Sequence, residues 1–212
     1  MKKTLQDILI DANSYLDLSA EVPTGTELNT RINFADRAVR EAASTDQMRE
    51  FKRVYVTNTS TLATIPLPAD FRELQTAPYI MNSSGSWVEY VPIEPEAMYE
   101  QSTSDYWCYL TGNRLTGYYL YFNQMISMAT LSITYQAYPT GFATLSDVCE
   151  LDDEEYVVER VESLVLESRS DDRFQIKKAD VEKRLSNMIG RGNKPTPGGT
   201  NQTKKNFTNP LA

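Results

Sequence analysis

Residues 152–165 read DDEEYVVERVESLV, and they decide the fold class because helix resumes here after a long strand-rich segment. Five apolar residues recur at helical spacing and form one face of this helix: Val157, Val158, Val161, Leu164 and Val165. Asp152 and Glu155 stand three residues apart ahead of that face, which is the pattern of a capping box. Negative charge in the first turn also suits the positive end of the helix dipole. The stretch therefore predicts a capped amphipathic helix that begins at Asp152.

A second helix is expected immediately downstream. Residues 170–172 (Ser-Asp-Asp) interrupt the pattern and provide a new cap. The apolar residues that follow give this helix one buried side: Ile176, Val181, Leu185, Met188 and Ile189. Gly190 is a natural C-terminal stop, because glycine readily adopts the left-handed backbone that ends many helices.

Towards the N-terminus, two more helices are predicted before the strand-rich segment. Thr4 is a suitable N-cap for the first of them, whose apolar face comprises Leu5, Ile8, Leu9, Ala12 and Leu16. Residues 23–25 (Pro-Thr-Gly) break the chain. The second helix is expected over residues 26–49, with an apolar stripe of Leu28, Ile32, Ala35, Val39 and Ala42.

Between these helix pairs, short runs rich in Val, Tyr, Thr and Ile alternate with turn residues, which is typical of strands. The expected strands are residues 52–57, 63–66, 73–81, 86–90, 106–110, 117–122 and 129–135. Asparagine and glycine at residues 82–85 and 111–113 predict two hairpin turns. Residues 95–99 are expected to form a short helical turn.

This order of elements predicts an α+β fold. N-terminal and C-terminal helix pairs are expected to form a four-helix bundle, with a β-rich insertion between them and an extended C-terminal arm. The helical bundle would comprise residues 1–50 and 150–190, the β-rich domain residues 51–149, and the arm residues 191–212. The arm has no apolar periodicity, so it cannot form a core of its own.

Charge is unevenly distributed along the chain. Residues 1–182 contain 15 basic and 29 acidic residues, a net charge of −14, whereas residues 183–212 carry +6. Such an acidic body is a poor binder of nucleic acid, because phosphate neutralisation requires clustered Lys and Arg. A basic end on an acidic body suggests an arm that contacts an acidic partner. The candidate contact residues in this arm are Arg191, Lys194, Lys204 and Lys205, with Phe207 and Leu211 as apolar anchors.

The residue types that carry most enzyme chemistry are scarce. The chain contains no histidine, which excludes Ser-His-Asp and Cys-His nucleophiles and imidazole metal ligands. Its two cysteines, Cys108 and Cys149, are interpreted as buried thiols, with a disulfide as the alternative. We therefore expect no catalytic residue, no metal site and no cofactor.

Two groups of acidic residues are candidate sites. The acidic residues within 147–155 lack the spacing of an EF-hand, and helix capping explains them more simply. Glutamates within 94–100 would serve a glycosidase only at a defined separation across a sugar. The absence of histidine makes a carboxylate enzyme the weakest hypothesis.

Aromatic residues gather in the strand-rich segment: Phe71, Tyr79, Trp87, Tyr90, Tyr106, Trp107 and Tyr109. Cross-strand pairing within sheets explains them, and a sugar-binding aromatic platform remains the alternative. No apolar run approaches the roughly 18 residues that a membrane span requires.

Residues 67–74 read LPADFREL, and they resemble a stretch common in the adaptor proteins of tailed bacteriophages, the head-to-tail connector family. Residues 131–135 followed by Tyr138-Pro139 are similar to the closing strand of that family. Residues 150–153 (Glu-Leu-Asp-Asp) also resemble the acidic start of its third helix.

The resemblance implies a structural virion protein and no enzyme. Adaptor subunits form a ring, typically a dodecamer, that joins the portal protein to the tail or nozzle protein. DNA passes through the channel that the ring lines, without specific binding. The arm, with its six candidate residues, would dock on the portal. The protein would be made in the host cytoplasm and reside in the virion neck, between capsid and tail, with no membrane contact. A tail-completion protein and a carbohydrate-binding or fibre-associated module remain alternatives.

Overall fold

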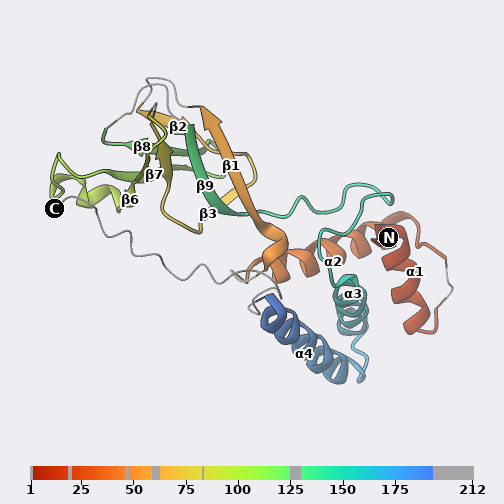
Figure 1. Ribbon diagram of the computed structural model, residues 1–212. Coiled ribbons are helices and arrows are strands. Elements are labelled where there is room, and N and C mark those ends of the chain that lie inside the picture. The colour runs from red at the N-terminus through yellow and green to blue at the C-terminus, as the bar shows by residue number, and fades with distance from the viewer. Residues whose placement is uncertain are drawn as a thin grey trace.

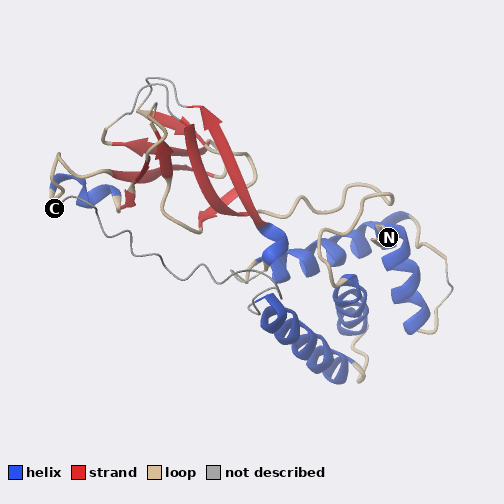
Figure 2. Cartoon of the chain, viewed as in Figure 1, coloured by secondary structure: helices blue, strands red, loops and turns tan. Residues whose placement is uncertain are grey.

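The computed structural model describes residues 2–18, 21–45, 48–58, 63–82, 84–124 and 130–192. Its helices gather at one end of the molecule and its strands at the other (Figures 1 and 2). The helices are α1 (Leu5–Tyr15), α2 (Gly25–Ala43), α3 (Glu154–Ser168) and α4 (Phe174–Gly192). There are also two short 3-10 helices. Arg49–Phe51 lies between α2 and the first strand, whereas Pro95–Tyr99 lies at the strand end of the molecule (Figure 2) and confirms the predicted helical turn.

The helices pack around α3 and do not form the four-helix bundle that the sequence predicts. α3 lies against each of the other three helices, whereas α1 and α2 approach each other at few positions. The β-rich region also separates the two helix pairs along the chain (Figure 1). The prediction of a four-helix bundle is therefore wrong, although the four predicted helices themselves are present.

The burial of α3 explains this difference. A bundle helix buries one stripe, but a helix that is buried on most sides occupies the centre of its cluster. The α3 side chains that are buried cover more than one stripe: Tyr156, Val157, Val158, Val161, Glu162, Ser163, Leu164, Val165 and Leu166. By contrast, α4 contributes Val181 and Met188 to the core. The predicted apolar face of α3 is therefore buried as expected, but the helix also buries residues outside that face.

The strands form two antiparallel-rich sheets that share one core. The strands are β1 (Lys52–Asn58), β2 (Thr64–Pro66), β3 (Phe71–Leu74), β4 (Tyr79–Met81), β5 (Trp87–Glu89), β6 (Val91–Pro92), β7 (Trp107–Asn113), β8 (Gly117–Phe122) and β9 (Thr130–Ala137). One sheet has the order β1-β9-β4-β5, with β3 also paired to β9, and the other has the order β2-β8-β7-β6. Apolar side chains from both sheets meet in a core separate from that of the helices.

One strand prediction and one turn prediction need correction. The strand expected over residues 73–81 is divided into β3 and β4, which both pair with β9. The hairpin turn at residues 82–85 is confirmed by a 3.0 Å hydrogen bond from the Gly85 amide to the Asn82 carbonyl. The other turn lies at residues 114–116 instead of 111–113, because β7 continues through Asn113, whose side chain accepts from the turn amides.

Two helix ends also differ from expectation. α2 ends at Ala43 instead of residue 49, because the Ser44 and Thr45 hydroxyls donate to the carbonyls of the last turn. Such side-chain bonds compete with continuation of a helix. α4 continues through Gly190, which is tolerated because a helical glycine costs only about 1 kcal/mol relative to alanine.

Both cysteines are expected to resist thiol reagents while the protein is folded. Cys108 and Cys149 are free and buried, and burial raises the pKa of Cys108 to about 12 and that of Cys149 to about 11. Since the thiolate is the reactive species, neither should react with a disulfide reagent at pH 8. Both should react at once in guanidinium chloride. Rapid labelling of the native protein would contradict this burial.

Candidate functional site

The junction between the helices and the sheets is the first candidate site. Residues 67–74, the LPADFREL stretch, lie there, and we call them the junction segment. Arg72 donates hydrogen bonds to the carbonyl of Ala43 and, at 3.3 Å, to that of Ser44. These carbonyls belong to the C-terminal end of α2, where a cation also interacts favourably with the helix dipole. Arg72 therefore caps α2 from β3.

Asp70 connects the junction segment to β1 and β9. Its carboxylate accepts from an Arg53 guanidinium N–H at 2.6 Å and from the Tyr135 hydroxyl at 3.0 Å. Burial and this contact with Asp70 raise the pKa of Tyr135 to about 12. Arg53 also lies 3.4 Å from the carboxylate of Glu150, which accepts the Thr140 amide at 2.8 Å. Charged hydrogen bonds thus link both long strands to the loop that leads into α3.

Phe71 anchors the junction segment in the core of the sheets. Its side chain is fully buried, and its ring stacks on Tyr135 with centroids 5.6 Å apart. The ring of Tyr118, on the opposite sheet, lies 5.3 Å away. The junction segment therefore attaches to the helices through Arg72 and to both sheets through Phe71.

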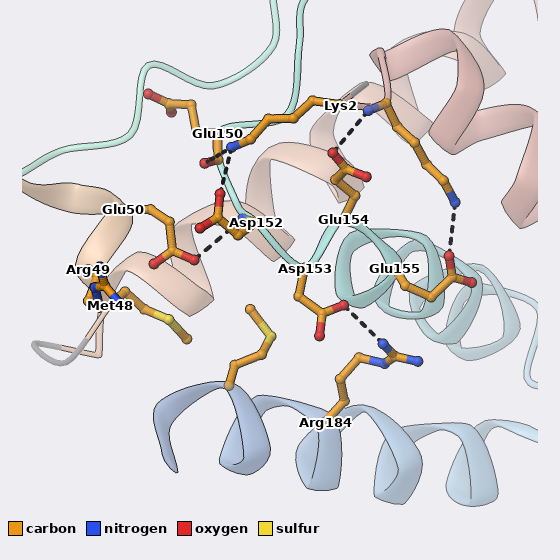
Figure 3. Close-up of a pocket in the computed structure, with 12 residues that line it drawn as sticks. Lys2, Met48, Arg49, Glu50, Glu150, Asp152, Asp153, Glu154, Glu155 and Arg184 are labelled. Carbon is orange, nitrogen blue, oxygen red and sulfur yellow. Dashed lines mark hydrogen bonds and ion pairs between the residues drawn. The ribbon is translucent and has the colours of Figure 1, made fainter. Parts of the chain in front are cut away.

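The acidic stretch comprises the acidic residues within 147–155 and runs into the first turn of α3. Its members from Glu150 onward line a second candidate site, a charged pocket of about 820 Å³ (Figure 3). The predicted capping box is wrong, because Asp153 occupies the N-cap and makes no capping hydrogen bond there. Its carboxylate instead pairs with Arg184 of α4 at 2.9 Å. Asp152 pairs with Lys2 at 3.1 Å, and the Lys2 ammonium also donates to the Glu150 carbonyl.

Lys3 completes this network between α1 and α3. Its ammonium lies 2.9 Å from Glu155 and 2.7 Å from Asp11. Burial alone would lower the pKa of Lys3, but hydrogen bonds to the two carboxylates outweigh that effect and raise it. The acidic stretch therefore holds the N-terminus and α4 against α3, which is a structural role.

The carboxylates of the described residues do not gather as metal ligands. Within the ranges that the structure describes, no group of three or more His, Cys, Asp or Glu side chains could hold a metal ion. Asp147, a member of the acidic stretch, accepts the amides of Ala143 and Thr144 at 2.6 and 2.7 Å. Among the same described residues, none of the helices is long and apolar enough to cross a membrane.

The aromatic residues divide between core and surface. Phe71 and Tyr90 are fully buried. Tyr109 and Tyr121 are register partners in β7 and β8, and their rings stack with centroids 4.8 Å apart. Trp107 stacks on Tyr109 at 6.4 Å. Because these rings cover one another's faces, the arrangement favours cross-strand pairing over a sugar platform.

The predicted arm contacts fall almost entirely outside the described residues. Arg191 lies in the last turn of α4. The other five candidates, Lys194, Lys204, Lys205, Phe207 and Leu211, lie beyond residue 192. Their role in docking stays a prediction.

Sequence reasoning missed the arginines that connect the elements. Arg53, Arg72 and Arg184 bind carboxylates or carbonyls that lie 17 or more residues away along the chain. No local pattern signals such partners, because periodicity and capping rules act within about four residues.

The chain was compared with known proteins and protein families. No curated protein matches the chain. A family model described as "SU10 adaptor protein" matches residues 3–194, which include all four helices and both sheets. The match confirms the resemblance to bacteriophage adaptors that the sequence suggested. The chain therefore belongs to the SU10 adaptor protein family and is a structural adaptor protein of a bacteriophage.

Proposed function

We propose that this chain forms a ring that joins the portal protein to the tail or nozzle protein in the virion neck. The observation that carries the proposal is the adaptor family match over residues 3–194. A ring of twelve copies, a dodecamer, is the expected stoichiometry. DNA would pass through the channel that the ring lines, and the net charge of −14 on residues 1–182 supports passage without specific binding.

The described residues support a structural role without catalysis. Carboxylates around the charged pocket are held in ion pairs with Lys2, Lys3 and Arg184. A catalytic acid or base instead needs a pKa matched to its task and a position facing a substrate. We propose that the pocket stabilises the helices and that the protein is no enzyme.

The separate cores of the helices and the sheets support the proposed division of the chain. Residues 1–50 and 150–190 would form the helical domain, and residues 51–149 the β-rich domain. Residues 191–212 would form the portal-docking arm. Its positive charge suits an acidic portal surface.

Portal docking is tested by binding of the full-length chain to purified portal rings of the same virus, followed by imaging. The full-length chain should decorate the portal, and a chain truncated after Gly192, which retains all of α4, should lose this binding. The paired charge reversal Lys204→Glu with Lys205→Glu should weaken binding at least tenfold, in a salt-dependent way.

The matched control reverses Lys178 and Lys183, which are exposed on α4, and changes the net charge equally. This control should bind as the parent does. Equal binding by the truncated and full-length chains would contradict docking through the arm. Binding to the tail protein alone would instead favour a tail-completion role.

A further inference from the structure

Two edge strands of the five-stranded sheet, β1 and β5, form the surface that the proposed function leaves unexplained. Within the described residues, they are the ends of the strand order β1-β9-β4-β5, and each pairs with a strand on one side only. β3 also pairs with β9 alone, but it lies off this order. An edge strand presents unpaired backbone N–H and C=O groups, so it is a template for pairing with another chain.

Both edges also expose apolar side chains. On β1, Val54 is 67% exposed and Val56 is 58% exposed, and on β5 Trp87 is 53% exposed. Lys52 of β1 and Glu89 of β5 are exposed as well. Edges that avoid association usually carry charge or proline at these positions. The central outward positions of β1 are instead valines, which suits an interface.

The strand directions allow one copy to extend the sheet of the next. β1 is antiparallel to β9, β9 to β4, and β4 to β5, so β1 and β5 run in opposite directions. When copies are placed head to tail, β1 of one copy therefore meets β5 of its neighbour in antiparallel orientation. Such a contact uses two different surfaces, and it closes into a ring when the rotation between copies permits.

One register satisfies both charge and packing. In an antiparallel pair, the residue numbers of opposite partners have a constant sum. If Lys52 lies opposite Glu89 of the neighbour, Val54 consequently lies opposite Trp87. All four side chains are exposed in the isolated chain. Opposite-charge pairs and aromatic pairs with β-branched residues are both favourable across strands.

We propose that a second copy of this chain docks on the sheet edge, with β1 of one copy paired to β5 of the next in this register. The proposal rests on the ring assembly proposed above and identifies the surfaces that join its subunits. Lys52, Val54, Trp87 and Glu89 are its contact residues. A two-fold pairing of β1 with β1 is the competing arrangement, and it would place Val54 opposite Val56.

Disulfide trapping tests the register in rings assembled on the portal. The double variant Val54→Cys with Trp87→Cys should give a ladder of covalent multimers on a non-reducing gel. Within one chain, β9 and β4 separate these positions by three strand spacings, about 14 Å, which is too far for a disulfide. The native cysteines are buried, so they contribute little background.

Two matched variants check the specificity of the trap. Val56→Cys with Trp87→Cys shifts the register by two residues and should give little cross-linking. Val54→Cys with Val56→Cys reports the two-fold pairing. Covalent dimers from this variant, without a ladder from the first, would overturn the head-to-tail contact.

A charge exchange tests the same contact without altering Val54 or Trp87. Lys52→Glu or Glu89→Lys alone places like charges opposite each other, and should raise the concentration needed for half-assembly about two- to fivefold. The double exchange should restore the parent value. Failure of the double variant to recover would overturn the pairing of Lys52 with Glu89.

The outcomes separate this contact from the proposed function. Rings that form on the portal without the Val54–Trp87 cross-link would overturn the sheet-edge contact and leave the adaptor ring in place. If portal binding and ring formation were both absent, the proposed function itself would fail, and the contact with it.

Discussion

Replacing Phe71 with alanine is expected to lower the free energy of unfolding by about 3–5 kcal/mol. The side chain is fully buried and packs on Tyr135 of β9 and Tyr118 of β8. Its removal leaves a cavity where the two sheets meet, and the aromatic contacts with both rings are lost as well. Urea unfolding, followed by circular dichroism, measures the effect.

The matched control for this prediction is Tyr99→Ala. Tyr99 is also aromatic and lies in the β-rich region, but it is 86% exposed, so its loss should change stability by no more than about 0.5 kcal/mol. Phe71→Leu should cost less than Phe71→Ala, because it retains more of the buried volume. A loss below about 1 kcal/mol for Phe71→Ala would show that Phe71 does not hold the sheets together.

Replacing Glu41 with alanine is expected to lower the free energy of unfolding by about 2–3 kcal/mol at neutral pH. Glu41 of α2 accepts two hydrogen bonds from Arg160 of α3, at 2.7 and 2.9 Å. Arg160 is only 12% exposed, so the variant leaves a largely buried guanidinium without its carboxylate. The expected loss is moderate because Glu41 itself is 33% exposed, so solvent partly screens the ion pair.

The ion pair between Glu41 and Arg160 makes the stability loss caused by Glu41→Ala depend on pH. Burial alone would raise the pKa of Glu41, but hydrogen bonds from Arg160 and Arg37 outweigh it and lower the pKa below its ordinary 4.5. A carboxyl with a lowered folded pKa stabilises the protein above its unfolded pKa, and that contribution is lost as pH falls through the folded value. The stability difference between the parent and Glu41→Ala should therefore shrink below pH 4.5.

Denaturant titrations at pH 7, 5 and 3 check this dependence. Glu182→Ala is the matched control, because Glu182 is an exposed glutamate on α4. It should change stability little at any of these pH values. If the loss caused by Glu41→Ala were the same at pH 3 as at pH 7, the ion pair would not be its cause.

Local signals predicted many individual elements. Thr4 caps α1 through a capping box with Asp7, and the predicted apolar face of α1 is buried. The turn at residues 82–85 forms the β4–β5 hairpin. These features depend on residues only a few positions apart, and hydrophobic periodicity and turn chemistry report on that range. The resemblance carried by residues 67–74 also predicted the family, which the match over residues 3–194 confirmed.

The candidate sites show the limit of this reasoning. The acidic residues before α3 and in its first turn suggested capping, but they form ion pairs with Lys2, Lys3 and Arg184. These cations lie on other helices or at the N-terminus, so no local pattern predicts the pairing. Local patterns could not predict the sheet edges either, because the exposure of Val54 and Trp87 depends on which strands lie beside them.

Helix and strand content, the uneven charge, the exclusion of histidine chemistry and the adaptor family all follow from the order of the amino acids. The folded structure is needed to see that α3 occupies the centre of the helices, that the strands divide into two sheets, and that β1 and β5 are edges. The difference lies in the range of the interactions involved. Helix and turn preferences arise between neighbours in the chain, whereas strand order and helix packing follow from side chains that meet only after folding, as Glu41 and Arg160 do across 119 residues.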